Sequence, residues 1–153
     1  MAIAAHRTPP ESAARSAAGE RTGPAGRTLR ALAAAHTVAL FGQPVFAGVY
    51  LSGDYDALGW HAVGADTVTS LGYLQLVAAL VCRVRLRRSW PLVGALAVAV
   101  AETVQYFAGL GGALWLHLPL GVATIAATVV LTIALWRTPL SPRRGARRED
   151  DRA

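Results

Sequence analysis

The chain has 153 residues, of which 54% are hydrophobic and only 16% are charged. Because an ordinary soluble domain carries charge on about a quarter of its residues, this composition excludes a water-soluble globule. The formal net charge of +6 does not indicate nucleic-acid binding, because the arginines are confined to three segments rather than spread along one basic surface.

The polar segment 1–29 contains three prolines and is predicted to be a disordered cytoplasmic tail. Four apolar stretches follow, each long enough to cross a bilayer, which takes about 20 residues. Helices are expected at residues 31–51, 60–82, 90–110 and 114–136. A second disordered tail is expected at residues 138–153. The sequence therefore predicts an all-α transmembrane domain over residues 30–137.

The arginines mark one side of the membrane. Five precede the first apolar stretch, four lie between the second and third, and six follow the fourth. Since Arg-rich segments stay in the cytoplasm, both termini and the tight turn predicted at residues 83–88 are expected there, in a bacterial plasma membrane. The same arginines are expected to contact anionic lipid headgroups.

The two halves of the chain share one pattern. Residues 43–64 and 105–121 both run glutamine, Phe-Ala-Gly, a short loop, tryptophan, histidine and glycine. Each predicted span also carries one stripe of small and polar residues, which in lipid should face other helices. We therefore expect an up-down four-helix bundle made of two similar helical hairpins.

A pair of histidines is the first candidate site. His61 and His117 lie at matched depth on the second and fourth spans, which are diagonal in such a bundle, so their imidazoles should face each other. Two imidazoles on opposite sides can hold a haem iron, which predicts a b-type haem site with Gly64 and Gly121 on the same stripes. A zinc or copper site is disfavoured because no third ligand is evident. Asp66 is the nearest candidate, but it lies five residues after His61 and should point to a different side of the helix. The alternative is that each histidine anchors the interface or hydrogen-bonds a free carbonyl.

A second candidate is a polar cluster near the membrane midplane, made of Gln43, Gln75, Glu102 and Gln105. An isolated carboxylate there costs several kcal/mol, so Glu102 is expected to be protonated or hydrogen-bonded, most simply to one of the glutamines. The cluster then either joins helices through hydrogen bonds or offers a proton-accepting position.

The remaining polar groups restrict the possibilities further. His36 has no second histidine at its expected depth, which excludes a second bis-histidine haem, and it is expected to bond within the bundle. The single cysteine, Cys82, permits no disulfide within the chain. Motifs for nucleotide binding or zinc hydrolysis do not occur, so no catalytic residue is predicted.

The chain resembles a family of small actinobacterial four-span membrane proteins of unknown function. The matching residues are Gln43, Phe46, Ala47, Gly48, His61, Gly64, Gln105, Ala108, Gly109, Leu116 and His117. It is also similar to one four-helix half of haem A synthase, which places haem-ligating histidines at the outer ends of its second and fourth helices, as His61 and His117 are placed here. That resemblance implies haem holding but not the synthase reaction, since the catalytic glutamate motif is missing.

The first functional hypothesis is therefore a membrane protein that carries electrons through one haem b. One alternative is a non-enzymatic membrane subunit that packs against a partner protein or a second copy of itself. Another is a small proton-coupled transporter that works through Glu102.

Overall fold

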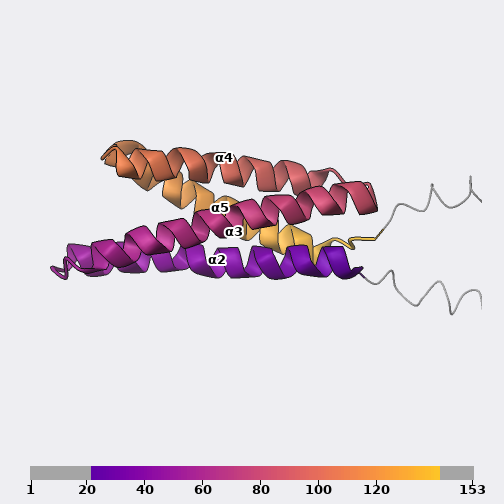
Figure 1. Ribbon diagram of the computed structural model, residues 1–153, viewed down its shortest axis with the longest axis horizontal. Coiled ribbons are helices and arrows are strands. Elements are labelled where there is room, and N and C mark those ends of the chain that lie inside the picture. The colour runs from indigo at the N-terminus through magenta and orange to yellow at the C-terminus, as the bar shows by residue number, and fades with distance from the viewer. Residues whose placement is uncertain (1–21, 142–153) are drawn as a thin grey trace, which may run out of the picture.

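The computed structural model describes residues 22–141, and within that range the chain is helical and has no strand. Its four long helices, joined by short connections, are shown in Figure 1. They are α2 (Pro24–Leu51), α3 (Ala57–Leu86), α4 (Trp90–Leu110) and α5 (Leu114–Arg137). The predicted all-α fold is confirmed.

The helices pack as a four-helix bundle. Helix α2 packs against α3 and α5, and helix α4 packs against the same two helices. The pairs α2/α4 and α3/α5 are therefore the two diagonals. We call the end with residues 52–56 and 111–113 the loop end, and the end with residues 22, 87–89 and 141 the terminal end.

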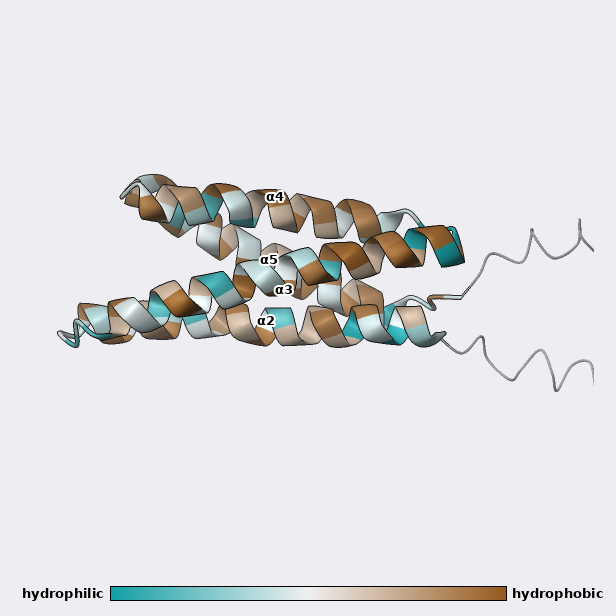
Figure 2. Cartoon of the chain, in the orientation of Figure 1, coloured by the Kyte–Doolittle hydropathy of each residue, from teal (hydrophilic) through white to brown (hydrophobic). Residues whose placement is uncertain are grey.

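The surface of the bundle suits lipid rather than water. Each helix is long and apolar enough to cross a membrane. Figure 2 shows hydrophobic residues, in brown, along all four helices. Large hydrophobic side chains face outward on every helix, with Val38 74%, Val93 65% and Val122 70% exposed. Such a surface in water would favour aggregation, so the chain is a multi-pass membrane protein.

The first helix begins earlier than the sequence predicts. Residues 24–29 fall in the predicted disordered tail, but the structure places them in α2, whose first residue is Pro24. Proline suits the first turn of a helix because that turn needs no amide donor. Leu29 is also fully buried at this end, which stabilises the additional turns. Residues 1–21 of the predicted tail lie outside the described residues.

The other predicted boundaries at the terminal end also need correction. Helix α3 continues to Leu86, so the turn occupies only residues 87–89, and Arg87 adopts a left-handed backbone with φ 51°. Leu86 is buried, which favours continuing the helix. In the predicted tail at 138–153, Leu140 and Ser141 are likewise buried, while residues 142–153 lie outside the described range.

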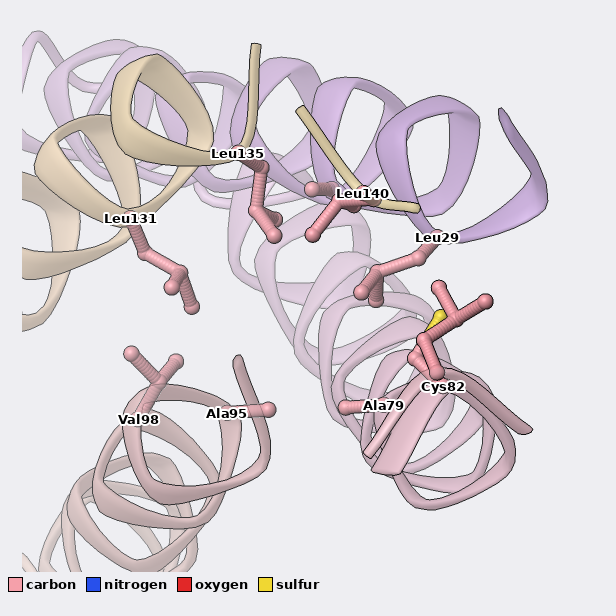
Figure 3. Close-up of a cluster of buried hydrophobic side chains, with 10 residues drawn as sticks. Leu29, Ala79, Cys82, Ala95, Val98, Leu131, Leu135 and Leu140 are labelled. Carbon is pink, nitrogen blue, oxygen red and sulfur yellow. The ribbon is translucent and has the colours of Figure 1, made fainter. Parts of the chain in front are cut away.

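The main cluster of buried hydrophobic side chains lies at the terminal end, while the loop end buries only small ones such as Ala57 and Ala108. Figure 3 shows leucine, valine, alanine and cysteine side chains from all four helices and from Leu140 meeting there. The core residues are Leu29, Ala33, Ala79, Cys82, Leu86, Ala95, Val98, Leu131, Leu135 and Leu140. At the loop end, by contrast, the α2–α3 and α4–α5 connections lie apart in Figure 1. The terminal end is thus the packed part of the bundle.

An arginine joins the first and last helices at this end. The Arg30 Nε donates to the Leu135 carbonyl at 2.8 Å, and Nη2 donates to the Thr138 carbonyl at 3.1 Å. The guanidinium also lies 5.6 Å from the centre of a Trp136 ring. A cation at the carbonyl end of a helix is favourable, because the last carbonyls have no partner within the helix.

We predict that Arg30→Ala lowers the free energy of unfolding by about 2 kcal/mol, because hydrogen bonds to charged groups are lost. Arg27→Ala is the matched control on the same helix, since Arg27 is exposed. The measurement is the thermal unfolding midpoint of the purified protein in mild detergent. Equal midpoints for the two variants would contradict this role of Arg30.

Candidate functional site

The structure brings the two predicted histidines together. The ring centroids of His61 and His117 are 6.1 Å apart, and the ring planes make an angle of 77°. Both side chains are half-buried, and they come from α3 and α5, which lie on a diagonal of the bundle. The two imidazoles therefore meet across the centre of the loop half.

Each imidazole is held by a backbone carbonyl of the preceding helix. The Nδ1 of His61 lies 3.2 Å from the backbone carbonyl oxygen of Gln43, and the Nδ1 of His117 lies 2.9 Å from the backbone carbonyl oxygen of Gln105. Because a carbonyl only accepts, each Nδ1 must carry a proton and donate it. In a neutral imidazole this leaves the lone pair on Nε2, which is the arrangement that second-shell carbonyls impose on metal-binding histidines.

The glycines of the predicted cofactor site lie beneath glutamine side chains. A Cβ on Gly64 would come within 2.2 Å of the Gln43 Nε2, and a Cβ on Gly121 within 2.7 Å of the Gln105 Nε2. The same relation thus occurs in both halves of the chain. Each glutamine presents its carbonyl to a histidine and its side chain to a glycine, a dual role that residue spacing does not reveal.

The histidine pair has only two protein ligands to offer. Within residues 22–141, no group of three His, Cys, Asp or Glu side chains comes together as a metal site. Beside the pair, the buried Oε1 of Gln43 has no hydrogen-bond partner among the described residues. The histidine pair thus presents two imidazoles and one unpaired amide oxygen.

Glu102 has a different partner from the expected one. Its Oε1 lies 2.5 Å from the His36 Nε2, while the His36 Nδ1 lies 3.0 Å from the Gln75 Oε1. All three side chains are buried, with 4%, 0% and 1% of Glu102, His36 and Gln75 exposed. The His36–Glu102 contact spans the α2/α4 diagonal. It replaces the expected bond from Glu102 to a glutamine.

The predicted midplane set therefore divides into two groups. Gln75 and Glu102 join His36, whereas Gln43 and Gln105 belong to the histidine pair. A Cβ on Gly72 would lie 2.3 Å from the Glu102 Oε2, so this glycine makes room for the carboxyl group. We call His36, Gln75 and Glu102 the buried triad.

The depth of His36 explains why the sequence does not predict the triad. His36 lies twelve positions after Pro24, the first residue of α2, and Glu102 lies twelve positions after Trp90, the first residue of α4. Since the two helices start at the same end, equal counts give equal depth. Starting the first span at residue 31 places His36 too close to the terminal end.

No protein-family model, curated protein or solved structure matches this chain.

We predict that Glu102→Leu lowers the free energy of unfolding by about 3 kcal/mol, because it leaves buried polar groups of His36 unpaired. Glu102→Gln keeps a side chain that can hydrogen-bond His36 and should cost only about 1 kcal/mol. Thermal unfolding in detergent measures both variants. Equal losses would show that the hydrogen bond to His36 contributes nothing to stability.

We also predict opposite effects of two glycine substitutions. Gly64→Ala adds a Cβ that forces the Gln43 amide to move, which lowers the unfolding midpoint. The Cβ added by Gly48→Ala meets nothing within 4 Å. The second variant should stabilise helix α2 by as much as about 1 kcal/mol, because alanine favours the helix over glycine. The same thermal measurement applies, and two stabilised variants would argue against the packing of Gln43 on Gly64.

Proposed function

We propose that this membrane protein binds one b-type haem through His61 and His117 and carries single electrons. The observation that carries the proposal is the 6.1 Å separation of the two ring centroids, with both Nδ1 atoms donating to carbonyls. With metal–nitrogen bonds of about 2 Å, two imidazoles on opposite sides of one metal ion have ring centroids about 6 Å apart.

The number of ligands favours haem over a bare metal ion. A structural zinc site takes four ligands and a catalytic one takes three from the protein, whereas this pair supplies two. Haem iron needs only axial ligands from the chain, and two histidines are sufficient for that.

The packing of the loop half also supports a bound group. The buried hydrophobic cluster lies wholly at the terminal end, while the histidine pair is half-buried. Gln43 Oε1 lacks a hydrogen-bond partner among residues 22–141. A large, flat and mostly apolar ligand between the two histidines would add packing to this half, whose fully buried apolar residues, such as Ala57, are small.

Each residue then has a defined task. Bound haem supplies an iron that alternates between the ferric and ferrous states. His61 and His117 bind it through Nε2, and the Gln43 and Gln105 carbonyls fix the tautomer and orientation of the rings. The Arg distribution favours cytoplasmic termini in a bacterial plasma membrane. The site would then lie near the outer surface.

We predict that the protein purified in mild detergent from haem-supplied cells shows a Soret band that shifts when dithionite reduces the iron. His61→Ala and His117→Ala should each lose bound haem, because one axial ligand is missing. His36→Gln is the matched control, since it removes an imidazole from the buried triad and leaves both proposed ligands in place.

A second arm separates loss of a ligand from loss of the fold. In His61→Gly, added free imidazole should restore the band, because it can occupy the position of the missing side chain. A wild-type protein that is folded and colourless would refute haem binding.

A further inference from the structure

A group of polar side chains lies on the outward face of α3 and α4. The Tyr106 hydroxyl donates to the Asp66 Oδ1 at 2.8 Å, and the Tyr73 hydroxyl lies 2.9 Å from the Thr103 Oγ1. Asp66 and Tyr73 are exposed, as is Ser70 between them. We call these five residues the α3–α4 polar face. Polar and ionisable residues within a span normally face protein or a ligand rather than lipid chains.

Asp66 lies too deep to be an ordinary interfacial acid. It follows Trp60 by six positions in α3, which places it about 9 Å further from the loop end along the helix axis. Among the described residues, Tyr106 is the one side chain that donates to this carboxyl group. The other carboxyl oxygen of Asp66 can therefore accept a further hydrogen bond from a ligand.

An apolar groove continues from the polar face toward the terminal end. It has a volume of about 210 Å³ and runs between α3 and α4, with Leu76, Leu96 and Val100 among its lining residues. Tyr73 and Thr103 also line it, so their hydrogen bond lies where the groove meets the polar face. The surface thus offers an acceptor and a phenol at one end and hydrocarbon at the other.

We propose that the α3–α4 polar face and this groove bind a lipid-soluble hydroquinone. Its hydroxyl would donate to Asp66, and its apolar tail would lie in the groove. A phospholipid fits less well, because its polar headgroup stays at the interface and only its tails reach this depth.

The inference rests on the proposed function, because the hydroquinone would be the electron donor for the haem. The polar face lies on the outward side of the two helices, at a depth similar to that of the proposed ligands. Asp66 lies five positions after His61 on α3, and Tyr106 directly follows Gln105, whose carbonyl accepts from His117. A ring bound at Asp66 would therefore lie about 8 Å from His61 along the α3 axis, and the electron would cross the α3–α4 contact to reach the histidine pair.

The reaction balances as two one-electron transfers. A hydroquinone loses two electrons and two protons when it becomes a quinone. Each electron would go to a separate haem-loaded chain, so one hydroquinone would reduce two chains. The Asp66 carboxylate would accept the first hydroxyl proton and release it to solvent before it accepts the second.

The kinetic test uses haem-loaded protein and a benzohydroquinone with a decyl tail. Ferrous haem is followed by its visible absorption after rapid mixing. Asp66→Asn should slow reduction at least tenfold, because the amide cannot accept the proton, while dithionite still reduces the haem fully. Asp56→Asn, in the exposed connection between α2 and α3, should react at the wild-type rate. Reduction of Asp66→Asn at the wild-type rate would overturn the proposal.

A binding test does not depend on the haem. Equilibrium dialysis of the same decyl benzohydroquinone, kept reduced without oxygen, against the haem-free protein in detergent should give saturable binding. Val100→Trp fills the groove and should weaken binding at least tenfold. Val93→Trp is the control, because Val93 is exposed on the same helix but does not line the groove. Binding equally strong in both variants would contradict the site.

The two proposals fail in different ways. A colourless protein that binds the hydroquinone, with binding lost in Val100→Trp, refutes haem binding and supports the hydroquinone site. A protein that takes up haem but whose haem-free form binds no hydroquinone refutes the site alone.

A third test asks whether a second copy of the chain occupies the face. Ser70→Cys in a Cys82→Ala background reports a self-interface. Rapid cross-linking between copies by a bis-maleimide that added hydroquinone does not slow would overturn the proposal. Slow cross-linking, or cross-linking that hydroquinone blocks, supports it.

Discussion

The structure depends on one constraint, which is that a bilayer provides no hydrogen-bond partners for polar side chains inside it. A polar group in the bundle is therefore stabilised when it finds a partner in the protein. His36 meets Glu102 across the α2/α4 diagonal, and His61 meets His117 across the α3/α5 diagonal. These contacts determine which face of each helix turns inward, while the remaining apolar faces are nearly equivalent toward lipid.

The two contacts lie at different depths and have different consequences. The buried triad is enclosed and its hydrogen bonds are satisfied by Gln75 and Glu102, which suits a structural role next to the hydrophobic core. The histidine pair is half-buried, and each ring uses one nitrogen on a carbonyl. A fully satisfied cluster fixes the bundle, whereas a pair with free nitrogens is available for a ligand.

The sequence is sufficient for the four spans and for the proximity of His61 to His117, because apolar length and matched depth follow directly from residue order. It does not predict the partner of Glu102, since the true start of α2 depends on the burial of Leu29. The roles of Gln43 and Gln105 are also missed, because their backbone carbonyls accept from the histidines and every residue type has a carbonyl. Nor does residue spacing predict the bond between Tyr106 and Asp66, which depends on how α3 and α4 pack.

The most direct test of the proposed haem site is the electron paramagnetic resonance spectrum of the oxidised protein at low temperature. Two imidazole ligands would make a bound ferric iron low-spin, and ring planes that kept the 77° angle between His61 and His117 would give a highly anisotropic signal. We predict that signal in the wild-type protein and its loss in His117→Ala. A high-spin ferric signal, or a folded protein without haem iron, would contradict the account.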